Sequence, residues 1–366
     1  MYAVVHVEVE IAGNLVPARG FQMIKLRRTT VLVVGAGFSY DLGYPLTRDL
    51  LHGLNMSKSL RKTFDEVVRF HHPNWDKRTS TLPDIEELLT EWAANEDLLP
   101  SLRRSGPFDT EDLRQLRTDL LSEIASWFHR IHSDNSRARA RLLKLFRERL
   151  RAAENPIIIS FNWDYELDKF LFGDGINRTN YGLDEAQFET PVLLKPHGSL
   201  NWYPAETGKH IKPELREMLW HDKDHPDESM YCFLRWRTPR SSHNRQYVPW
   251  IVPPTHVKEV GHDMLKTIWR RCVDCLSVAK EIFFVGYSLP VADIHSRYIF
   301  RCGFHNQKEG RPSDEEEGRE AHTGPAKVYV VNPDNSAFRR IEPIVGEKCS
   351  WIPLTAKRWL REEVEN

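Results

Sequence analysis

A short apolar run followed at once by glycines constrains the fold of this chain more than any other feature. Residues 30–34 (Thr-Val-Leu-Val-Val) are β-branched or apolar, which predicts a buried strand. Gly35 and Gly37 follow, and the pattern then becomes helical. Glycine permits backbone conformations that other residues avoid, and it lets a phosphate approach main-chain N–H groups. The stretch therefore predicts a strand, a tight turn and a helix, which form either a diphosphate-binding turn or an ordinary strand–helix connection.

This stretch differs from the dinucleotide-binding fingerprint G-x-G-x-x-G. The third glycine of that pattern would fall at position 40, which is Tyr40. In the fingerprint, a second strand places a ribose-binding acid about 20 residues further on. Here the residues after Thr47 have a helical pattern instead. A plain dehydrogenase is therefore disfavoured.

The composition excludes several other classes of protein. The chain has 366 residues, of which 40% are hydrophobic, and this is enough for one large domain. A net charge of -1 gives no overall attraction to nucleic acid or to a membrane surface. No apolar stretch has the length of a membrane span, and residues 1–20 do not have the basic start of a secretory signal. With five scattered cysteines, the sequence predicts a reduced, cytoplasmic protein.

Further apolar runs alternate with helical segments along the chain. They cover residues 156–159, 192–194, 281–285 and 327–331. Short buried strands that alternate with helices are typical of parallel sheets. We therefore predict an α/β fold, a Rossmann-like parallel sheet with helices on both faces and an inserted helical module.

We expect one main domain over residues 23–355. Residues 1–22 form either a half-exposed strand or a spurious extension before Met23. Inside the domain we expect a helical insertion at 48–150, an irregular insertion at 204–250 and a mobile acidic loop at 304–325, and after it a C-terminal tail at 356–366. The arginine-rich segment 137–151 is interpreted as a solvated helix face or, alternatively, as a docking surface for nucleic acid or an acidic partner.

Small or polar residues follow each predicted strand at the point where it ends. In open parallel sheets, ligands bind beyond the carboxyl ends of the strands, so these residues are expected to converge on one crevice. Each of them alone also has a structural explanation as a turn former, a helix cap or a hydrogen-bonded histidine. The residues are Gly35, Gly37 and Ser39; Asn162 and Asp164; His197 and Gly198; Gly286 and Ser288; and Asn332 and Asp334.

Five of these segments, in order, resemble the sirtuin-like (SIR2-like) domain, and most closely the NAD-cleaving SIR2-like effectors of prokaryotic antiviral defence. The resemblance covers roughly residues 30–350. It rests on Gly-Ala-Gly-Phe-Ser at 35–39, Ser-Phe-Asn-Trp-Asp at 160–164, Lys-Pro-His-Gly-Ser-Leu-Asn-Trp at 195–202, Gly-Tyr-Ser-Leu-Pro-Val-Ala-Asp-Ile-His at 286–295 and Val-Asn-Pro at 331–333.

The resemblance implies that NAD+ binds across the sheet and that its nicotinamide–ribose bond is cleaved. Asn162 would then position the ribose or the attacking water, His197 would act as a base or bind ribose hydroxyls, and Asp164 would order the turn. Residues expected to bind NAD+ are Gly35, Ala36, Gly37 and Ser39 at the diphosphate, Gly286 and Ser288 on the ribose–phosphate side, Asn332 at the adenosine ribose, and Asp293 and His295 lining the site or holding a neighbouring subunit.

Two departures from deacylating sirtuins matter for the activity. Those enzymes usually carry a zinc module of two cysteine pairs, whereas this chain has one Cys-x-x-Cys, Cys272 and Cys275, within an apolar helical pattern. We therefore expect core cysteines, no zinc and no metal site. The acetyl-lysine groove motif is not visible either. Both departures favour NAD+ hydrolysis over protein deacylation.

Three functional hypotheses remain open from the sequence. The first is an NAD+ glycohydrolase that depletes NAD+ in anti-phage defence under the control of oligomerisation or a protein partner. That partner would be a motor ATPase, an Argonaute-like protein or a phage component, with nucleic acid involved only indirectly and no membrane. The second is an NAD-dependent deacylase or ADP-ribosyltransferase. The third is a non-catalytic sensor that binds NAD or ADP-ribose.

Overall fold

The computed structural model describes residues 29–362, except for 77, 79–81, 99–107, 135–136, 185–190, 222, 224, 236–246, 253–261, 310–324 and 347. The expected N-terminal extension at 1–22 lies outside the described residues. None of the described helices is long and apolar enough to cross a membrane.

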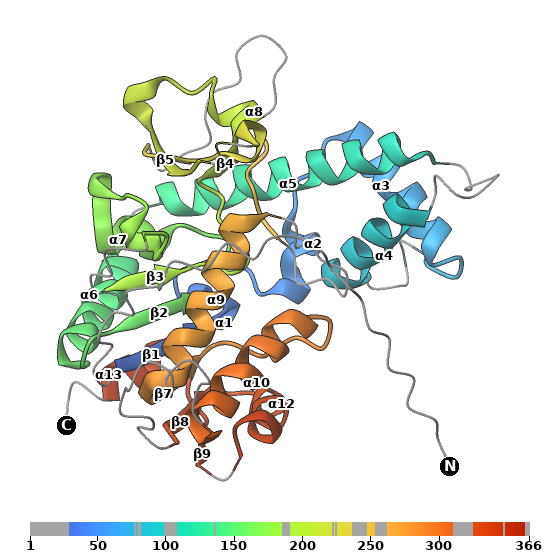
Figure 1. Ribbon diagram of the computed structural model, residues 1–366. Coiled ribbons are helices and arrows are strands. Elements are labelled where there is room, and N and C mark those ends of the chain that lie inside the picture. Colours follow the sequence, from blue (N-terminus) through green and yellow to red (C-terminus); the bar gives the residue numbers. More distant parts are fainter. Residues whose placement is uncertain are drawn as a thin grey trace, which may run out of the picture.

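A six-stranded parallel sheet forms the centre of the molecule (Figure 1). Its strands lie in the order β3-β2-β1-β7-β8-β9, and every neighbouring pair is parallel. Numbered along the chain, this is the order 3-2-1-4-5-6 of a Rossmann-type sheet. The strands are β1 (Thr29–Val34), β2 (Ile157–Ser160), β3 (Val192–Leu194), β7 (Ala279–Val285), β8 (Lys327–Val331) and β9 (Cys349–Ile352).

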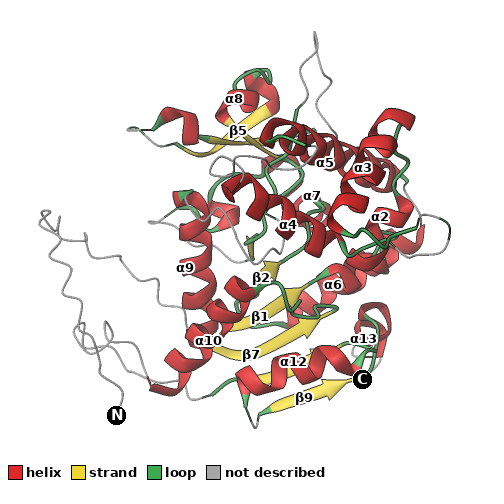
Figure 2. Cartoon of the chain, turned by 90° about the vertical axis from the view of Figure 1, so that its right-hand side faces the viewer, coloured by secondary structure: helices red, strands yellow, loops and turns green. Residues whose placement is uncertain are grey.

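Helices cover both faces of this sheet, as predicted (Figure 2). On one face lie α9 (Asp263–Val278), α10 (Ile294–Glu309) and α12 (Asn335–Val345); on the other lie α6 (Arg137–Ala152) and α13 (Ala356–Glu362). The predicted α/β fold is thereby confirmed. Cys272 and Cys275 are buried in α9, so they are core cysteines, as expected.

The long connection between β1 and β2 is helical, as the periodicity predicts. After the short helix α1 (Ala36–Tyr40), it contains α2 (Leu50–Gly53), α3 (Lys58–His71), α4 (Ile85–Leu98), α5 (Thr110–Ser133) and α6. Figure 1 shows α3, α4 and the start of α5 extending away from the sheet. The basic helix α6 presents most of its cations to solvent, but two of them pack inward. Arg139 is buried, and the Arg149 guanidinium lies 4.8 Å from the centre of the Phe283 ring.

The sequence predicted an irregular insertion at 204–250. Instead, its described residues carry most of a small antiparallel sheet of order β4-β6-β5. Its strands are β4 (Trp202–Pro204), β5 (Arg216–Trp220) and β6 (Met230–Phe233), with α8 (Ala205–Gly208) beside them. Tyr203, Ile211, Phe233 and Tyr247 form its own hydrophobic cluster. The strands are only three to five residues long, too short to show an alternating pattern, which explains the wrong prediction.

Two further boundaries differ from the sequence prediction. The expected acidic loop 304–325 begins inside a helix, because α10 continues to Glu309; most of the remainder lies outside the described residues. The expected tail at 356–366 contains α13, whose Trp359 and Leu360 are buried. The remaining helical elements are α7 (Glu166–Phe172) and short 3-10 turns at Thr47–Asp49, Gly173–Gly175, Thr179–Tyr181, Pro213–Leu215 and Pro226–Glu228.

Candidate active site

The parallel register brings the predicted segments to one edge of the sheet. Val34 at the end of β1 pairs with Ser160 of β2 and with Val285 of β7, and Val285 pairs with Val331 of β8. The carboxyl ends of these strands are therefore aligned, and the residues that follow them lie along one edge of the sheet. Strand order reverses between β1 and β7, and a doubly wound sheet binds its ligand at such a switch point.

The two glycine turns at this switch point are packed directly against each other. Gly37 N–H donates to Gly286 O at 2.9 Å, and Gly286 N–H donates to Val331 O at 2.9 Å. A Cβ on Gly37 would lie 2.8 Å from the Gly286 Cα. These glycines therefore have a packing requirement of their own. Their role in binding a diphosphate, like that of Gly35 and of Ala36 at the first position of α1, stays a prediction.

Gly286→Ala is expected to destabilise the protein by about 2–5 kcal/mol, because it adds left-handed strain of about 1–2 kcal/mol to an overpacking cost of about 1–3 kcal/mol. Gly286 has φ +61°, and its Cβ would lie 2.3 Å from the backbone nitrogen of Phe38. Urea denaturation measures the effect. Gly175→Ala is the control, because nothing lies within 4 Å of its Cβ position. Equal stability of the two variants would contradict this account of the turn.

Asn162 is bonded to the glycine turn by its side chain. Its Nδ2 donates to Gly35 O at 2.9 Å and to Ser39 Oγ at 2.8 Å, and the residue is buried. Ser39 Oγ in turn donates to Asp164 Oδ2 at 2.6 Å. Both N–H groups of the amide are thus in use. The carbonyl oxygen Oδ1 is then the atom that Asn162 can offer to a water or a ribose hydroxyl.

Asp164 lies behind Asn162 and supports the turn. Its Oδ1 accepts from the N–H of Glu166 at 3.1 Å, in addition to the bond from Ser39. Burial raises the pKa of Asp164, against the opposing effects of the Lys195 ammonium and the Ser39 hydrogen bond. These bonds connect Asp164 with Ser39 and Glu166, and its role in ordering the turn for catalysis stays a prediction.

His197 is paired with a buried carboxylate on a different segment. Its Nε2 lies 2.9 Å from Asp293 Oδ2, and the side chain of Asp293 is fully buried. Ser296 holds the same carboxyl through its hydroxyl and its N–H. The sequence suggested that Asp293 lines the site or holds a neighbouring subunit. The second role is wrong, because Asp293 is enclosed within its own chain.

One aromatic side chain, that of Phe161, connects the segments that carry Asn162, His197 and Gly286. Phe161 directly precedes Asn162, and its ring centre lies 5.0 Å from that of His197. The Phe161 ring also stacks on Tyr287, which follows Gly286, with centres 4.4 Å apart. Segments from β2, β3 and β7 therefore meet around one ring at the carboxyl edge of the sheet.

Three further predicted site residues follow β7 and β8. The backbone oxygen of Ser288 accepts from Arg340 Nε at 2.7 Å. Asn332 Oδ1 accepts from the N–H of Asp334 at 3.0 Å, so its side chain closes a turn in the present structure. A role for Ser288 or Asn332 at a ribose stays a prediction. His295, another candidate, lies close to Trp269, with ring centres 5.4 Å apart.

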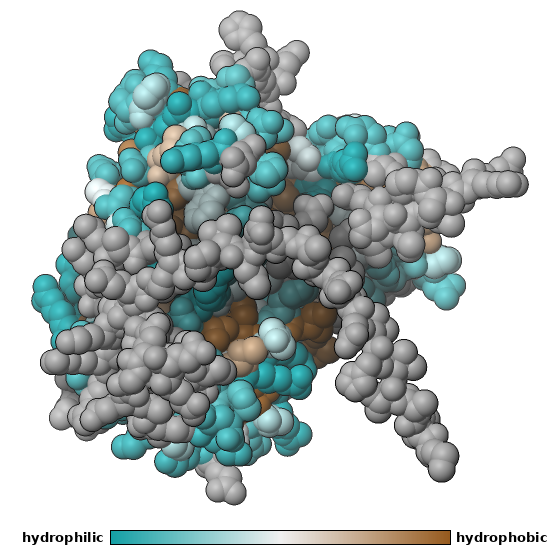
Figure 3. All heavy atoms as spheres, viewed as in Figure 1, coloured by the Kyte–Doolittle hydropathy of each residue, from teal (hydrophilic) through white to brown (hydrophobic). Residues whose placement is uncertain are grey.

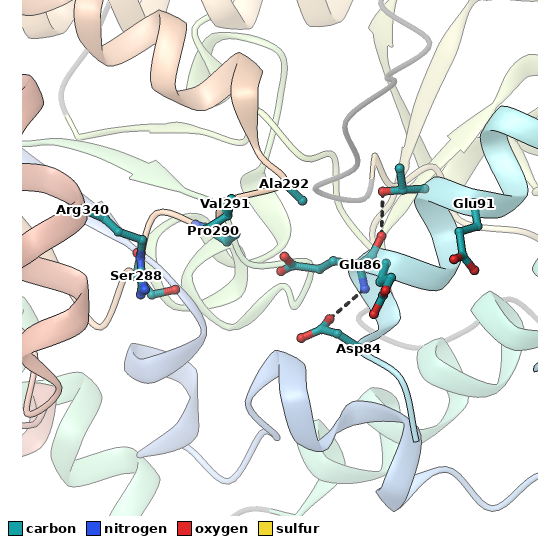
Figure 4. A pocket seen from close by; sticks show the side chains of 10 residues that line it. Asp84, Glu86, Glu91, Ser288, Pro290, Val291, Ala292 and Arg340 are labelled. Carbon is teal, nitrogen blue, oxygen red and sulfur yellow. Dashed lines mark hydrogen bonds between the residues drawn. The ribbon is translucent and has the colours of Figure 1, made fainter. Parts of the chain in front are cut away.

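A cavity of about 530 Å³ opens beside Ser288 (Figure 4). One side comes from the start of α4 and the other from the segment between β7 and α10, where Arg340 of α12 lies beside Ser288. It meets the predicted site at Ser288 and does not include Asn162 or His197. Figure 3 shows a hydrophobic area near the middle of an otherwise largely hydrophilic face. The cavity is lined by Asp84, Glu86, Glu87, Thr90, Glu91, Ser288, Pro290, Val291, Ala292 and Arg340.

Sequence reasoning missed the buried charges that hold the two catalytic candidates in place. Lys195 Nζ donates to Asp164 O at 2.6 Å, to Asp168 Oδ2 at 3.0 Å and to Ser199 Oγ at 2.6 Å. One ammonium thus connects the turn after β2 with the turn after β3. A lysine placed directly after three apolar strand residues was the available signal, since lysine is seldom buried unless it is paired.

A second buried network joins the helical insertion to the same turn. Glu166 Oε1 lies 2.9 Å from His132 Nδ1, 3.1 Å from Arg139 Nη1 and 2.7 Å from the Tyr44 hydroxyl, which donates to it. Burial alone would raise the pKa of Glu166, but His132, Tyr44 and Arg139 together hold it below its usual value. The helical insertion is therefore bound to the site side of the sheet by charge as well as by apolar packing.

No family model matches the sequence, and the comparison with curated proteins finds no match. Solved structures with a similar fold include a Sir2 homologue–NAD complex, with 13% identity and a TM-score of 0.39 over 92% of this chain and 88% of that chain. A Sir2–p53 peptide–NAD+ complex has 15% identity and a TM-score of 0.34 over 93% of each chain. At these low scores the likeness carries no argument about activity. The Rossmann-type assignment rests on the strand order itself.

Proposed function

We propose that the chain is an NAD+ glycohydrolase, which converts NAD+ and water into ADP-ribose and nicotinamide. The observation that carries the proposal is that Asn162 is bonded to the glycine turn at the switch point of the sheet, and that the ring of the adjacent Phe161 contacts His197, which is paired with Asp293. A dinucleotide lies across such a switch point. An amide and an oriented imidazole at that place are groups that hydrolysis requires and that simple binding does not.

The chemistry suits these residue types. Nicotinamide carries a positive charge in NAD+ and leaves as a neutral molecule with the electrons of the bond, so its departure needs no strong acid. The ribose carbon becomes oxocarbenium-like, and a water attacks it. Asn162 Oδ1 positions this water or the ribose hydroxyls, and positioning of this kind supplies a large part of the rate enhancement.

His197 accepts the proton that the attacking water loses. With the Nε2 proton directed at Asp293, the neutral ring presents Nδ1 as its basic nitrogen. The Asp293 carboxylate stabilises the imidazolium that forms, and its bonds from Ser296 keep it in position. In this scheme the proton passes from water to His197 and then to solvent.

The competing activities differ in what they require besides NAD+. An NAD-dependent deacylase or an ADP-ribosyltransferase consumes NAD+ only with an acylated peptide or an acceptor protein. A sensor binds NAD or ADP-ribose without consuming it. We further propose a cytoplasmic, homo-oligomeric effector of anti-phage defence, activated by assembly or by a protein partner, since uncontrolled NAD+ loss would harm the host.

The proposal is tested by comparing NAD+ consumption in buffer with consumption in the presence of an acetyl-lysine peptide. We expect the same rate in both, and a fall of at least about tenfold in Asn162→Ala, the loss of an oriented contact of about 1.4 kcal/mol or more. Asn180→Ala, on the 3-10 turn Thr179–Tyr181, is the control. Consumption that appears only with the peptide would favour the deacylase.

A further inference from the structure

A compact group of histidine and glutamate side chains lies at the junction of α3 and α4, outside the site described above. His72 directly follows α3, while Glu87 and Glu91 are on α4. Glutamates four residues apart project from the same side of a helix. In the part of the chain that the structure describes, ligand atoms of these three side chains all lie within 4.8 Å of one another.

The separations in this group are too long for good hydrogen bonds. His72 Nε2 lies 3.5 Å from Glu91 Oε2, and His71 Nδ1 lies 3.5 Å from the same oxygen. An N–H···O bond is about 2.7–3.2 Å long. His72 Nε2 and Glu91 Oε2 are nevertheless both buried, and neither has a hydrogen-bond partner among the described residues. Leaving two such atoms buried without partners is costly.

A shared metal ion accounts for these distances. Zinc binds histidine nitrogen and carboxylate oxygen at about 2.0–2.1 Å in a tetrahedral arrangement, so two of its ligands lie about 3.4 Å apart. That is close to the separation of His72 Nε2 and Glu91 Oε2. Imidazole together with carboxylate suits zinc and its neighbours in the transition series, whereas calcium and magnesium prefer oxygen alone.

We propose that His72, Glu87 and Glu91 bind one divalent transition-metal ion of the zinc type. With three protein ligands, the fourth position is taken by water or by the neighbouring His71. The site is distinct from the buried cysteines of α9 and does not depend on the proposed NAD+ cleavage. It joins the end of α3 to α4 and fixes the position of α4.

The ion would also change the charge of the cavity next to Ser288. Glu87 and Glu91 line this cavity together with Asp84 and Glu86, opposed by the single described cation Arg340. Such a wall repels a phosphate-bearing ligand. A bound dication offsets two of these four carboxylates.

The test is a Zn2+ titration of the metal-stripped, untagged full chain in competition with a chromogenic chelator. We expect one tight site in the wild type, and binding at least about tenfold weaker in each of His72→Ala, Glu87→Gln and Glu91→Gln. His52→Ala and Glu66→Gln, both exposed and outside the group, are the matched controls and should bind as the wild type does. Zn2+ should also raise the melting temperature of the wild type and of the controls, but not that of the three ligand variants.

The Glu87→Gln variant keeps the test decisive even if replacing the more buried His72 or Glu91 disturbs folding. Its side chain is exposed, so Glu87→Gln leaves the helix and its packing intact. Wild-type affinity in Glu87→Gln and Glu91→Gln would overturn the proposal. A wild type that binds Zn2+ no more tightly than His72→Ala would also overturn it and would leave a plain histidine–glutamate ion pair.

Discussion

Replacing His197 by alanine is expected to lower kcat for NAD+ cleavage by about 10²–10⁴-fold, the usual contribution of a positioned base. His197 is buried, and its Nε2 lies 2.9 Å from Asp293 Oδ2, so the ring is held in one orientation. The turn that carries His197 is also held by a second segment of the chain, because Val252 N–H donates to His197 O at 2.9 Å. KM should change far less than kcat, since the base acts in the transition state.

Asp293→Asn separates orientation of the imidazole from simple structural support. The amide keeps the shape of the carboxyl but cannot stabilise an imidazolium, so kcat should fall and the acidic limb of the pH–rate profile should move to lower pH. His305→Ala, an exposed histidine on the same helix as Ser296, is the control for both variants. Steady-state kinetics across pH measure these effects. An unchanged kcat in His197→Ala would remove this residue from the mechanism.

Lys195→Met is expected to destabilise the protein by about 3–5 kcal/mol, because it leaves a buried carboxylate without its cation. Lys195 is fully buried, and Asp168 is 1% exposed. Methionine has a similar length and fills the space, so the change isolates the charge and its hydrogen bonds. The lost bond to Asp164 O would also loosen the turn that carries Asn162.

A double-mutant cycle with Asp168→Asn tests this explanation. The two changes together should cost less than the sum of the two alone, since the second removes the charge that the first leaves unpaired. Urea denaturation of the four proteins measures the coupling, with the exposed Lys212→Met as a control. Additive effects would mean that the two side chains do not act as a pair.

The central strands could be predicted because their residues must all be apolar enough to be buried on both faces of the sheet. β1, β2, β3 and most of β7 are buried on both faces and are continuous apolar runs. The sixth strand could not be found in the same way. β9 is an edge strand with the sequence Cys-Ser-Trp-Ile, and two of its four residues are exposed. It is held by pairing with β8, an interaction that the sequence of β9 alone does not indicate.

The helix α13 was missed for a related reason. It is short and highly charged, and its burial depends on residues far away in the chain. Trp359 packs against Phe283 of β7, with ring centres 5.4 Å apart, and the Arg149 guanidinium of α6 lies 5.0 Å from the centre of the Trp359 ring. Only the folded sheet brings these three side chains together.

The site shows the same division between local signals and distant partners. Asn162 and His197 could be singled out from the sequence as polar residues close to the ends of apolar strands. Their supports were not predictable, because Asp293 and Lys195 act across segments that are well separated in the sequence. The network of Glu166 with His132 and Arg139 was hidden for the same reason, since Arg139 looks like one more cation of a basic helix.

Product analysis of NAD+ incubated with the wild-type protein alone tests the central claim most directly. Mass spectrometry at high protein concentration, without any peptide or acceptor, should find nicotinamide and ADP-ribose formed in equal amounts as NAD+ disappears. NAD+ that binds but stays intact at every protein concentration, in buffer and in host lysate with and without phage infection, would contradict the hydrolase and would leave a binding module.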